Sequence, residues 1–391
     1  MKIITRTVWI LSLVSLLTDI ASEMLYPVMP LYLKSIGFSI VLIGMLEGVA
    51  EAIAGLSKGY FGRLSDHKGL RMPFVQGGYA LSALSKPMMA LLIAPVWIFF
   101  ARTIDRLGKG LRTGARDAVL SDEATPATKG KIFGFHRSMD TVGAVIGPLL
   151  ALAYLQWHPG EYKPLFIIAF APGLLAVLCS LLLKDKKSIG HRGEMAFFSF
   201  LHYWKISPVL YKRLVIGLLV FALANSSDVF LLLKIRQSGM NDSEVITVYI
   251  FYNLIFAVCA FPIGILGDKV GLKKMFLIGL FLFVVVYSGM GFSRSRFIFY
   301  GLFFLYGVYA AATEGISKAW ISNIASQKDT ATAIGVYSGF QSICTMLASA
   351  LAGYLWFQYG AMATFLVSAM AAGIVLIYFF LFIPAPDIGQ S

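Results

Sequence analysis

The sequence predicts an all-α membrane protein with twelve transmembrane helices, arranged as two pseudo-symmetric six-helix bundles. Three observations support this fold class. The 391 residues are 58% hydrophobic and only 14% charged, whereas soluble globular domains carry about 25% charged residues. The apolar residues form blocks of about 20 or more, which are long enough to cross a hydrocarbon core about 30 Å thick. A short motif also occurs twice, once in each half of the chain.

Hydropathy divides the chain into twelve predicted spans. Their approximate ranges are 8–33, 40–64, 72–93, 95–120, 129–156, 163–183, 212–238, 243–267, 273–292, 296–323, 329–357 and 361–383. The longest polar interruption, residues 184–211, predicts a cytoplasmic linker between an N-terminal bundle (1–183) and a C-terminal bundle (212–391). The N-terminal segment is interpreted as an uncleaved first helix, because its apolar stretch continues without a convincing cleavage site.

The excess of Lys and Arg over Asp and Glu indicates how the chain is oriented in the membrane. The formal net charge is +13, and Lys and Arg gather between predicted spans. Cytoplasmic loops of membrane proteins collect these residues, so nucleic-acid binding is not predicted. Both termini are expected in the cytoplasm, in a multi-pass protein of the cytoplasmic (inner or plasma) membrane. The three cysteines fall in predicted spans and indicate neither a disulfide framework nor a metal site.

The repeated motif follows the second and the eighth predicted spans. Residues 62–71 and 264–273 both read G-x-L-x-D-x-x-G-x-[RK]. The glycines permit a tight turn between two helices. A motif that recurs at the same place in two sets of six spans predicts a parallel repeat about an axis along the membrane normal.

At these residues the chain resembles the major facilitator superfamily of secondary transporters, and the resemblance covers essentially the whole chain. It implies gating roles for Gly62, Asp66, Arg71, Asp122, Asp268 and Lys273. In the family pattern the Asp66 carboxylate faces the N-terminus of span eleven, which favours negative charge. Arg71 is expected to pair with Asp122. The resemblance implies that these contacts close the cytoplasmic side in an outward-open state.

Span five resembles, in part, the drug:proton antiporter branch of this family. Gly134, Gly143 and Gly147-Pro148 match its glycine–proline motif, although the final glycine pair is missing. The match favours export by antiport. The alternative is that these small residues only let neighbouring helices pack closely.

Acidic residues inside the predicted spans are candidate proton-coupling groups, because ionisable residues deep in a bilayer are costly. Asp19 and Glu23 share one face of span one, and Glu47 and Glu51 share one face of span two. Two carboxylates held close in a low dielectric resist double ionisation, so one is expected to hold a proton near neutral pH. The alternative is that these acids pair with nearby bases and hold the helices together.

A stripe of bases on span four predicts an anion site. Arg102, Arg106 and Lys109 lie deep in the span, whereas Arg112 and Arg116 lie near its cytoplasmic end and are expected to snorkel. Arg presents a planar fork suited to carboxylate or phosphate. The alternative is that the arginines only pair with acids of neighbouring spans. The substrate-binding candidates are Tyr26, Lys86, Arg102, Arg106, Lys109, Arg137, Asp140, Asp228 and Glu314.

These residues predict a proton-coupled secondary transporter that exports a small polar solute, anionic or zwitterionic, by alternating access. Its partners are the solute, protons and the lipid bilayer, and a monomer is the family default. No P-loop, H-E-x-x-H or G-x-S-x-G motif appears, so no enzyme, ATP-driven pump, cofactor or metal is predicted. The alternatives are an uptake symporter of an organic anion, a multidrug exporter, and a lipid flippase whose basic interior receives a phosphate headgroup.

Overall fold

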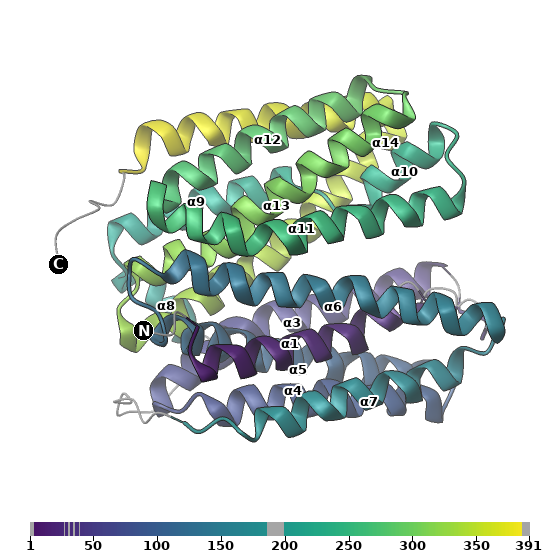
Figure 1. The fold of residues 1–391 in the computed structure, drawn as a ribbon, viewed down its shortest axis with the longest axis horizontal. Coiled ribbons are helices and arrows are strands. Elements are labelled where there is room, and N and C mark those ends of the chain that lie inside the picture. Colours follow the sequence, from purple (N-terminus) through teal and green to yellow (C-terminus); the bar gives the residue numbers. More distant parts are fainter. Residues whose placement is uncertain are drawn as a thin grey trace. The chain divides into compact units, whose positions relative to one another are not determined.

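The computed structural model describes residues 4–26, 28–29, 32–33, 36–38, 40–185 and 199–384, and the regular elements within these residues are all helices. They are α1 (Arg6–Leu25), α3 (Ile40–Lys68), α4 (Met72–Leu91), α5 (Pro95–Asp122), α6 (Lys129–Trp157), α7 (Tyr162–Ser180), α8 (Ser199–Ile206), α9 (Val209–Ala224), α10 (Val229–Gln237), α11 (Asp242–Val270), α12 (Leu272–Phe292), α13 (Arg296–Ile324), the short 3₁₀ helix η1 (Gln327–Asp329) and α14 (Thr330–Phe382) (Figure 1).

Eight helical segments of the described chain are long and apolar enough to cross a membrane. They are Arg6–Leu25, Lys129–Trp157, Tyr162–Ser180, Val209–Gln237, Thr247–Val270, Leu272–Phe292, Arg296–Ile324 and Gln327–Phe382. The predicted second, third and fourth spans are helices α3, α4 and α5, whose polar and charged side chains lower their hydropathy. Two of these helices, α4 and α5, carry all the basic side chains that line the pocket described below.

The observed helices differ from the predicted spans in three places. The first span was predicted to run to residue 33, but α1 ends at Leu25, and Met29, Tyr32 and Leu33 are again helical. Pro27 follows α1 in the sequence and lacks the backbone N–H that a continuous helix would use. The last two predicted spans are the two helical parts of α14, which meet at a kink where Gly360 is non-helical. Gly360 has a φ of 82°, a conformation that glycine adopts without steric cost.

The third difference lies in span seven, which was predicted as one helix over 212–238. The structure contains two helices there, α9 and α10, separated by residues 225–228. This stretch reads Asn-Ser-Ser-Asp, and such side chains offer the backbone hydrogen bonds that compete with helix. One example is the Ser227 hydroxyl, which accepts the backbone N–H of Val229 at 3.4 Å.

The predicted linker, residues 184–211, contains the helix α8 and one contact that ties it to the first copy of the loop motif. The Asp185 carboxylate accepts the backbone N–H groups of Arg71 and Met72, at 2.9 Å and 3.2 Å for one of its oxygens. Asp185 therefore serves the free N–H groups at the start of α4.

The chain divides into two compact units. Unit 1 comprises Met1–Glu123, Met139–Ile206 and Ser326–Ser342, and unit 2 comprises Ala124–Ser138, Ser207–Ala325 and Ile343–Ser391. Unit 1 thus includes the first part of α14, and unit 2 includes the first part of α6. The rest of each of these helices belongs to the other unit. The bundles predicted from the sequence, 1–183 and 212–391, differ from the two compact units at these two segments. The division of the chain into two repeats at these boundaries stays a prediction.

Close helix contacts in unit 1 depend on glycine. A Cβ atom on Gly78 of α4 would lie 2.6 Å from the carbonyl oxygen of Gly108 of α5, and the converse distance is also 2.6 Å. On α6, a Cβ on Gly143 would lie 2.6 Å from the carbonyl oxygen of Leu16 in α1. Small residues here let backbones approach closely. Gly143 of the span-five glycine motif therefore permits a close helix contact, which fits both interpretations of that motif.

Candidate functional site

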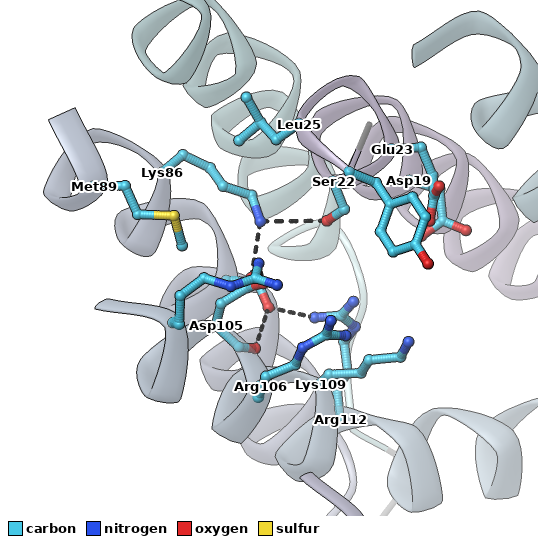
Figure 2. Close-up of a pocket in the computed structure, with 13 residues that line it drawn as sticks. Asp19, Ser22, Glu23, Leu25, Lys86, Met89, Asp105, Arg106, Lys109 and Arg112 are labelled. Atoms are coloured by element: carbon cyan, nitrogen blue, oxygen red, sulfur yellow. Dashed lines mark hydrogen bonds and ion pairs between the residues drawn. The ribbon is translucent and has the colours of Figure 1, made fainter. Parts of the chain in front are cut away.

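A pocket in unit 1 is lined by charged side chains from α1, α4 and α5 (Figure 2). The hollow contains about 570 Å³ of space, part of it open to solvent. Three carboxylates line it, those of Asp19, Glu23 and Asp105. Five bases line it as well, namely Lys86, Arg102, Arg106, Lys109 and Arg112. The predicted substrate-binding residue Tyr26 also lines the pocket, and 54% of its surface is exposed.

Asp105 is the hub of a buried network on one wall of the pocket (Figure 2). Lys86 Nζ lies 2.8 Å from Asp105 Oδ1 and also donates to the Ser22 hydroxyl at 3.3 Å. The Ser85 hydroxyl donates to the same carboxylate at 3.2 Å, and Arg102 Nη1 lies 3.8 Å from Asp105 Oδ2. Asp105 therefore offsets part of the positive charge of two bases, Lys86 and Arg102.

The stripe of basic residues on α5 continues into the interior of unit 1. Arg112 is buried, donates to the Ser82 hydroxyl at 2.7 Å and lies over the Tyr79 ring, 4.6 Å from its centroid. Arg116 is also buried and lies 2.9 Å from the Asp117 carboxylate. The prediction that these two arginines snorkel is wrong, because α5 packs against α4 and turns the stripe toward the interior of the unit.

The acids of α1 face the same pocket. Asp19 and Glu23 line it one helical turn apart, as their spacing predicts. The charged groups that act on Asp19 include the carboxylates of Glu23 and Asp140 and the guanidinium of Arg112. Asp140 of α6 accepts a hydrogen bond from the Ser15 hydroxyl. Three carboxylates and the base stripe therefore meet inside unit 1.

Two of the predicted proton-coupling residues, Glu47 and Glu51, lie outside the residues whose side chains the structure describes. Their role stays a prediction. Sequence reasoning also left out several pocket residues, among them the serines Ser22 and Ser82. Ser22 could have been found from the helical repeat, because it lies three residues after Asp19 and shares its face. Ser82 offered no comparable signal, since small hydroxyl residues are common in helix contacts between membrane spans.

A second polar cluster occupies unit 2. Arg137 and Glu314, both predicted substrate-binding residues, form an ion pair and are 34% and 43% exposed. Arg137 also lies over the Phe256 ring, 5.1 Å from its centroid. The predicted Asp228 accepts a hydrogen bond from the Tyr306 hydroxyl at 2.6 Å. The structure therefore distributes the predicted substrate-binding residues over both units.

The two copies of the loop motif each place a carboxylate at the start of a helix. Asp66 accepts the backbone N–H of Thr332 in α14 at 2.6 Å, and also the Thr332 hydroxyl. Asp268 accepts the backbone N–H groups of Gly130 and Lys131 in α6, each at 2.7 Å. The first N–H groups of a helix lack intrahelical partners, and the helix dipole favours negative charge there. The position expected for Asp66 is therefore observed, while the gating role stays a prediction.

Asp66 lies beyond the predicted end of span two, in buried surroundings. Burial raises the pKa of its carboxyl above the ordinary value, against the opposing effects of Arg71 and the hydrogen bonds from Thr332. As the pH falls, the Asp66 carboxylate is therefore protonated at a higher pH than it would be without burial.

Arg71 has a different partner from the one expected. Its guanidinium pairs with Asp66 and donates to the Ser65 hydroxyl at 3.1 Å, in place of the expected pair with Asp122. The turn explains this change: Gly69, with a φ of 64°, reverses the chain so that Arg71 lies back against the end of α3.

The remaining predicted gating residues make close backbone contacts. A Cβ on Gly62 would lie 2.5 Å from the carbonyl oxygen of Ala331 in α14, so only glycine permits this approach of the helices. Lys273 Nζ donates to the carbonyl oxygens of Phe380, at 3.2 Å, and of Ile383 at the end of α14. A base is favoured at this helix terminus.

Asp66→Ala is expected to destabilise the protein by about 3 kcal/mol or more, because it leaves the buried Arg71 without its carboxylate. The matched control is Arg296→Ala, which removes a pair with Glu244 in which the Arg296 side chain is 61% exposed, and it should cost at most about 1 kcal/mol. Unfolding of both variants in detergent would measure the difference. Equal losses would show that the Asp66 cap contributes no more than a surface ion pair.

Comparisons with known proteins agree on one family. A family model described as Major Facilitator Superfamily matches residues 11–237 and 234–391. An uncharacterized MFS-type transporter of Methanocaldococcus jannaschii is 31% identical over 388 residues, covering 96% of this chain and 95% of that protein. A multi-drug resistance efflux pump PmrA homolog of Lactococcus lactis is 24% identical over 356 residues, covering 86% and 85%.

Solved structures show the same fold at low sequence identity. The human organic anion transporter MFSD10 (TETRAN) has a TM-score of 0.77 at 17% identity, with 96% of this chain and 99% of that chain covered. The proton:xylose symporter XylE has a TM-score of 0.74 at 14% identity, with 97% and 95% covered. These likenesses concern the helical architecture alone.

Proposed function

The chain belongs to the major facilitator superfamily, and on that premise we propose that it exports a small anion or zwitterion in exchange for protons. The protein is a multi-pass membrane transporter and not an enzyme, and its twelve-helix fold of two six-helix halves is that of the family. The proposal adds the charge of the solute, the coupling ion and the direction of movement.

The charge balance of the unit 1 pocket carries the proposal. Five bases and three carboxylates line it, so the ionised pocket has an excess of two positive charges. A charge removed from water is costly unless an opposite charge compensates it. A carboxylate or phosphate group on the solute would supply that compensation, and the guanidinium forks of Arg106 and Arg112 suit either group.

The acids in the same pocket support proton coupling. Asp19 and Glu23 lie beside the base stripe, so a change in their protonation alters the field that the bound anion experiences. Asp19 and Glu23 can receive the positive group of a zwitterionic solute while the bases receive its anionic group. Protonation of either acid removes that attraction, so the proton and the solute compete for the pocket, as exchange requires. Alternating access would then couple the movement of the solute to that of the proton. A relative named as a multi-drug resistance efflux pump supports export over uptake.

Export of lipophilic cations is the second candidate, because several relatives carry multidrug resistance names. Asp19 and Glu23 would then receive the cation. The nearby Lys109 and Arg112 oppose this reading, since a cation in the pocket would meet two further positive charges.

Thermal unfolding of the purified protein with a panel of ligands tests both candidates. The panel contains organic carboxylates, organic phosphates, zwitterionic amino acids and lipophilic cations such as tetraphenylphosphonium, each at acidic and neutral pH. Anions or zwitterions are expected to raise the melting temperature in a saturable manner, and the zwitterions more weakly at acidic pH, where the proton competes. Stabilisation by the lipophilic cations alone would overturn the anion proposal and favour multidrug export.

A further inference from the structure

Helices α1 and α6 are in close contact beside the pocket of unit 1. A Cβ atom on Gly143 of α6 would lie 2.9 Å from the Cβ atom of Asp19 in α1, and one on Gly147 would lie 3.0 Å from the backbone carbonyl carbon of Glu23. Small residues allow such an approach of two helix backbones. A side chain of α6 that lies one turn before Gly143 is therefore next to α1.

Asp140 is the residue that this contact brings close to Asp19. It lies three residues before Gly143 on α6. Its carboxylate accepts a hydrogen bond from the Ser15 hydroxyl, and Ser15 lies four residues before Asp19 on α1. Residues three or four apart on a helix have Cβ atoms about 5–6 Å apart. Both contacts therefore place Asp140 about one helical turn from Asp19.

The two carboxyl groups differ in their surroundings. Asp19 lines the pocket (Figure 2), whereas Asp140 does not line it and is only 6% exposed. The negative charge of Asp140 nevertheless acts on Asp19. Two carboxylates held close in a low dielectric resist double ionisation, so they titrate as a pair that tends to keep one proton. Asp140 thus stands behind the acids that face the solute.

Other charged and titratable groups surround the pair. They are Glu23 of α1, Lys109, Arg112, Arg116 and Asp117 of α5, and His136 one turn before Asp140 on α6. Arg116 donates to the Ser15 hydroxyl at 3.4 Å and is paired with Asp117 at 2.9 Å, so its charge is shared between acids. A proton on the pair therefore changes the charge balance on which solute binding depends.

We propose that Asp19 and Asp140 share the transported proton, with Asp140 as a second acceptor behind the solute pocket. This inference rests on the proton exchange proposed above. A proton that enters the pocket binds a carboxylate oxygen of Asp19 and passes to a carboxylate oxygen of Asp140, directly or through one water. The O–H bond at Asp19 breaks as the O–H bond at Asp140 forms, so Asp19 becomes a carboxylate again and can receive the positive group of the solute.

The order of the two acids along α1 fits an exporter. Ser15, which holds Asp140, lies nearer to the start of α1 than Asp19 does. With the N-terminus in the cytoplasm, as the sequence predicts, Asp140 lies on the cytoplasmic side of Asp19. In an exchange that exports the solute, the proton leaves on this same side.

Labelling with dicyclohexylcarbodiimide, an apolar reagent that modifies protonated carboxyl groups, would test the pair in the purified full chain without any solute. The extent of modification at Asp19 is measured by peptide mass spectrometry as a function of pH. In Asp140→Asn the neighbouring negative charge is absent, so modification of Asp19 should require a pH lower by about one unit or more. An unchanged profile would overturn the proposal.

Ser15→Ala is the matched control, because it removes the hydrogen bond to Asp140 and keeps both carboxyl groups. Its profile should stay close to that of the unmodified protein. An equal shift in Ser15→Ala and Asp140→Asn would show that Asp140 acts only through helix packing, and would overturn the shared proton.

The unmodified protein provides a second measurement, which decides the question if Asp140→Asn fails to fold. Asp19 and Asp140 should be modified over the same pH range, and chains modified at both positions should be rare, because the pair holds one proton. Modification of Asp19 alone at every pH would overturn the proposal. Failure of the proposed function would be seen separately, as a ligand panel that gives no stabilisation by anions or zwitterions.

Discussion

Arg106→Gln is expected to lower transport of the anionic solute by about tenfold to a hundredfold while the protein remains folded. A hydrogen bond to a charged group contributes about 1.5–3 kcal/mol, and glutamine removes both the charge and the planar fork. Arg106 lines the pocket beside Lys109 and Arg112, where the proposed anion would bind, and its charge also acts on the Asp105 carboxylate. Counterflow of the stabilising anion in proteoliposomes would measure it.

Arg296→Gln provides the control for charge removal. Arg296 is 61% exposed and pairs with Glu244 at 2.8 Å, outside the pocket, so this variant should transport at the unmodified rate. Arg102→Gln separates the binding role from a purely structural one, because Arg102 lies 3.8 Å from Asp105. Retained counterflow in both Arg106→Gln and Arg102→Gln would contradict the anion proposal and leave the stripe with a structural role.

The repeat and the helical register could be predicted from the sequence because both depend on local spacing. The motif at 62–71 turns at Gly69 and its second copy turns at Gly271, and each turn brings one aspartate to the start of another helix. Asp19 and Glu23 lie four residues apart, which sets them on one face of α1 whatever surrounds that helix.

Features that depend on tertiary packing could not be predicted. The buried position of Arg112 follows from the close contact of α4 and α5, which two glycines distant in sequence permit. Arg71 pairs with Asp66 because of the geometry of the turn between them. The charges alone do not decide between Asp66 and Asp122 as its partner. The break at 225–228 was hidden because its few polar residues lie within a strongly apolar stretch.

The two units differ in the chemistry of their interiors. The pocket of unit 1 combines bases with acids, whereas the cluster of unit 2 combines the Asp228 carboxylate with tyrosine hydroxyls. Tyr306 lies with its ring centroid 5.0 Å from Tyr252 and 5.2 Å from Tyr309, so aromatic packing holds this cluster in place. Recognition of the charge of the solute is therefore expected to respond most strongly to substitutions in unit 1.

Asp19→Asn is expected to abolish transport driven by a proton gradient and to spare exchange at equal pH. Asparagine keeps the size of the side chain and some of its hydrogen bonding, but it cannot take up and release a proton near neutral pH. Asp19 faces Glu23 and Asp140 as well as Arg112, so its charge is coupled to that of the pocket. Accumulation under an imposed pH gradient, compared with counterflow in the same vesicles, separates the two activities.

Glu161→Gln is the control for this experiment, since Glu161 is 59% exposed and lies outside the pocket. It should accumulate the solute as the unmodified protein does. If Asp19→Asn also accumulates normally, Asp19 carries no coupled proton, and Glu23, Glu47 and Glu51 become the residues to test. If Asp19→Asn loses counterflow as well, its carboxylate is required for solute binding or for the packing of α1, and coupling must be sought in another acid.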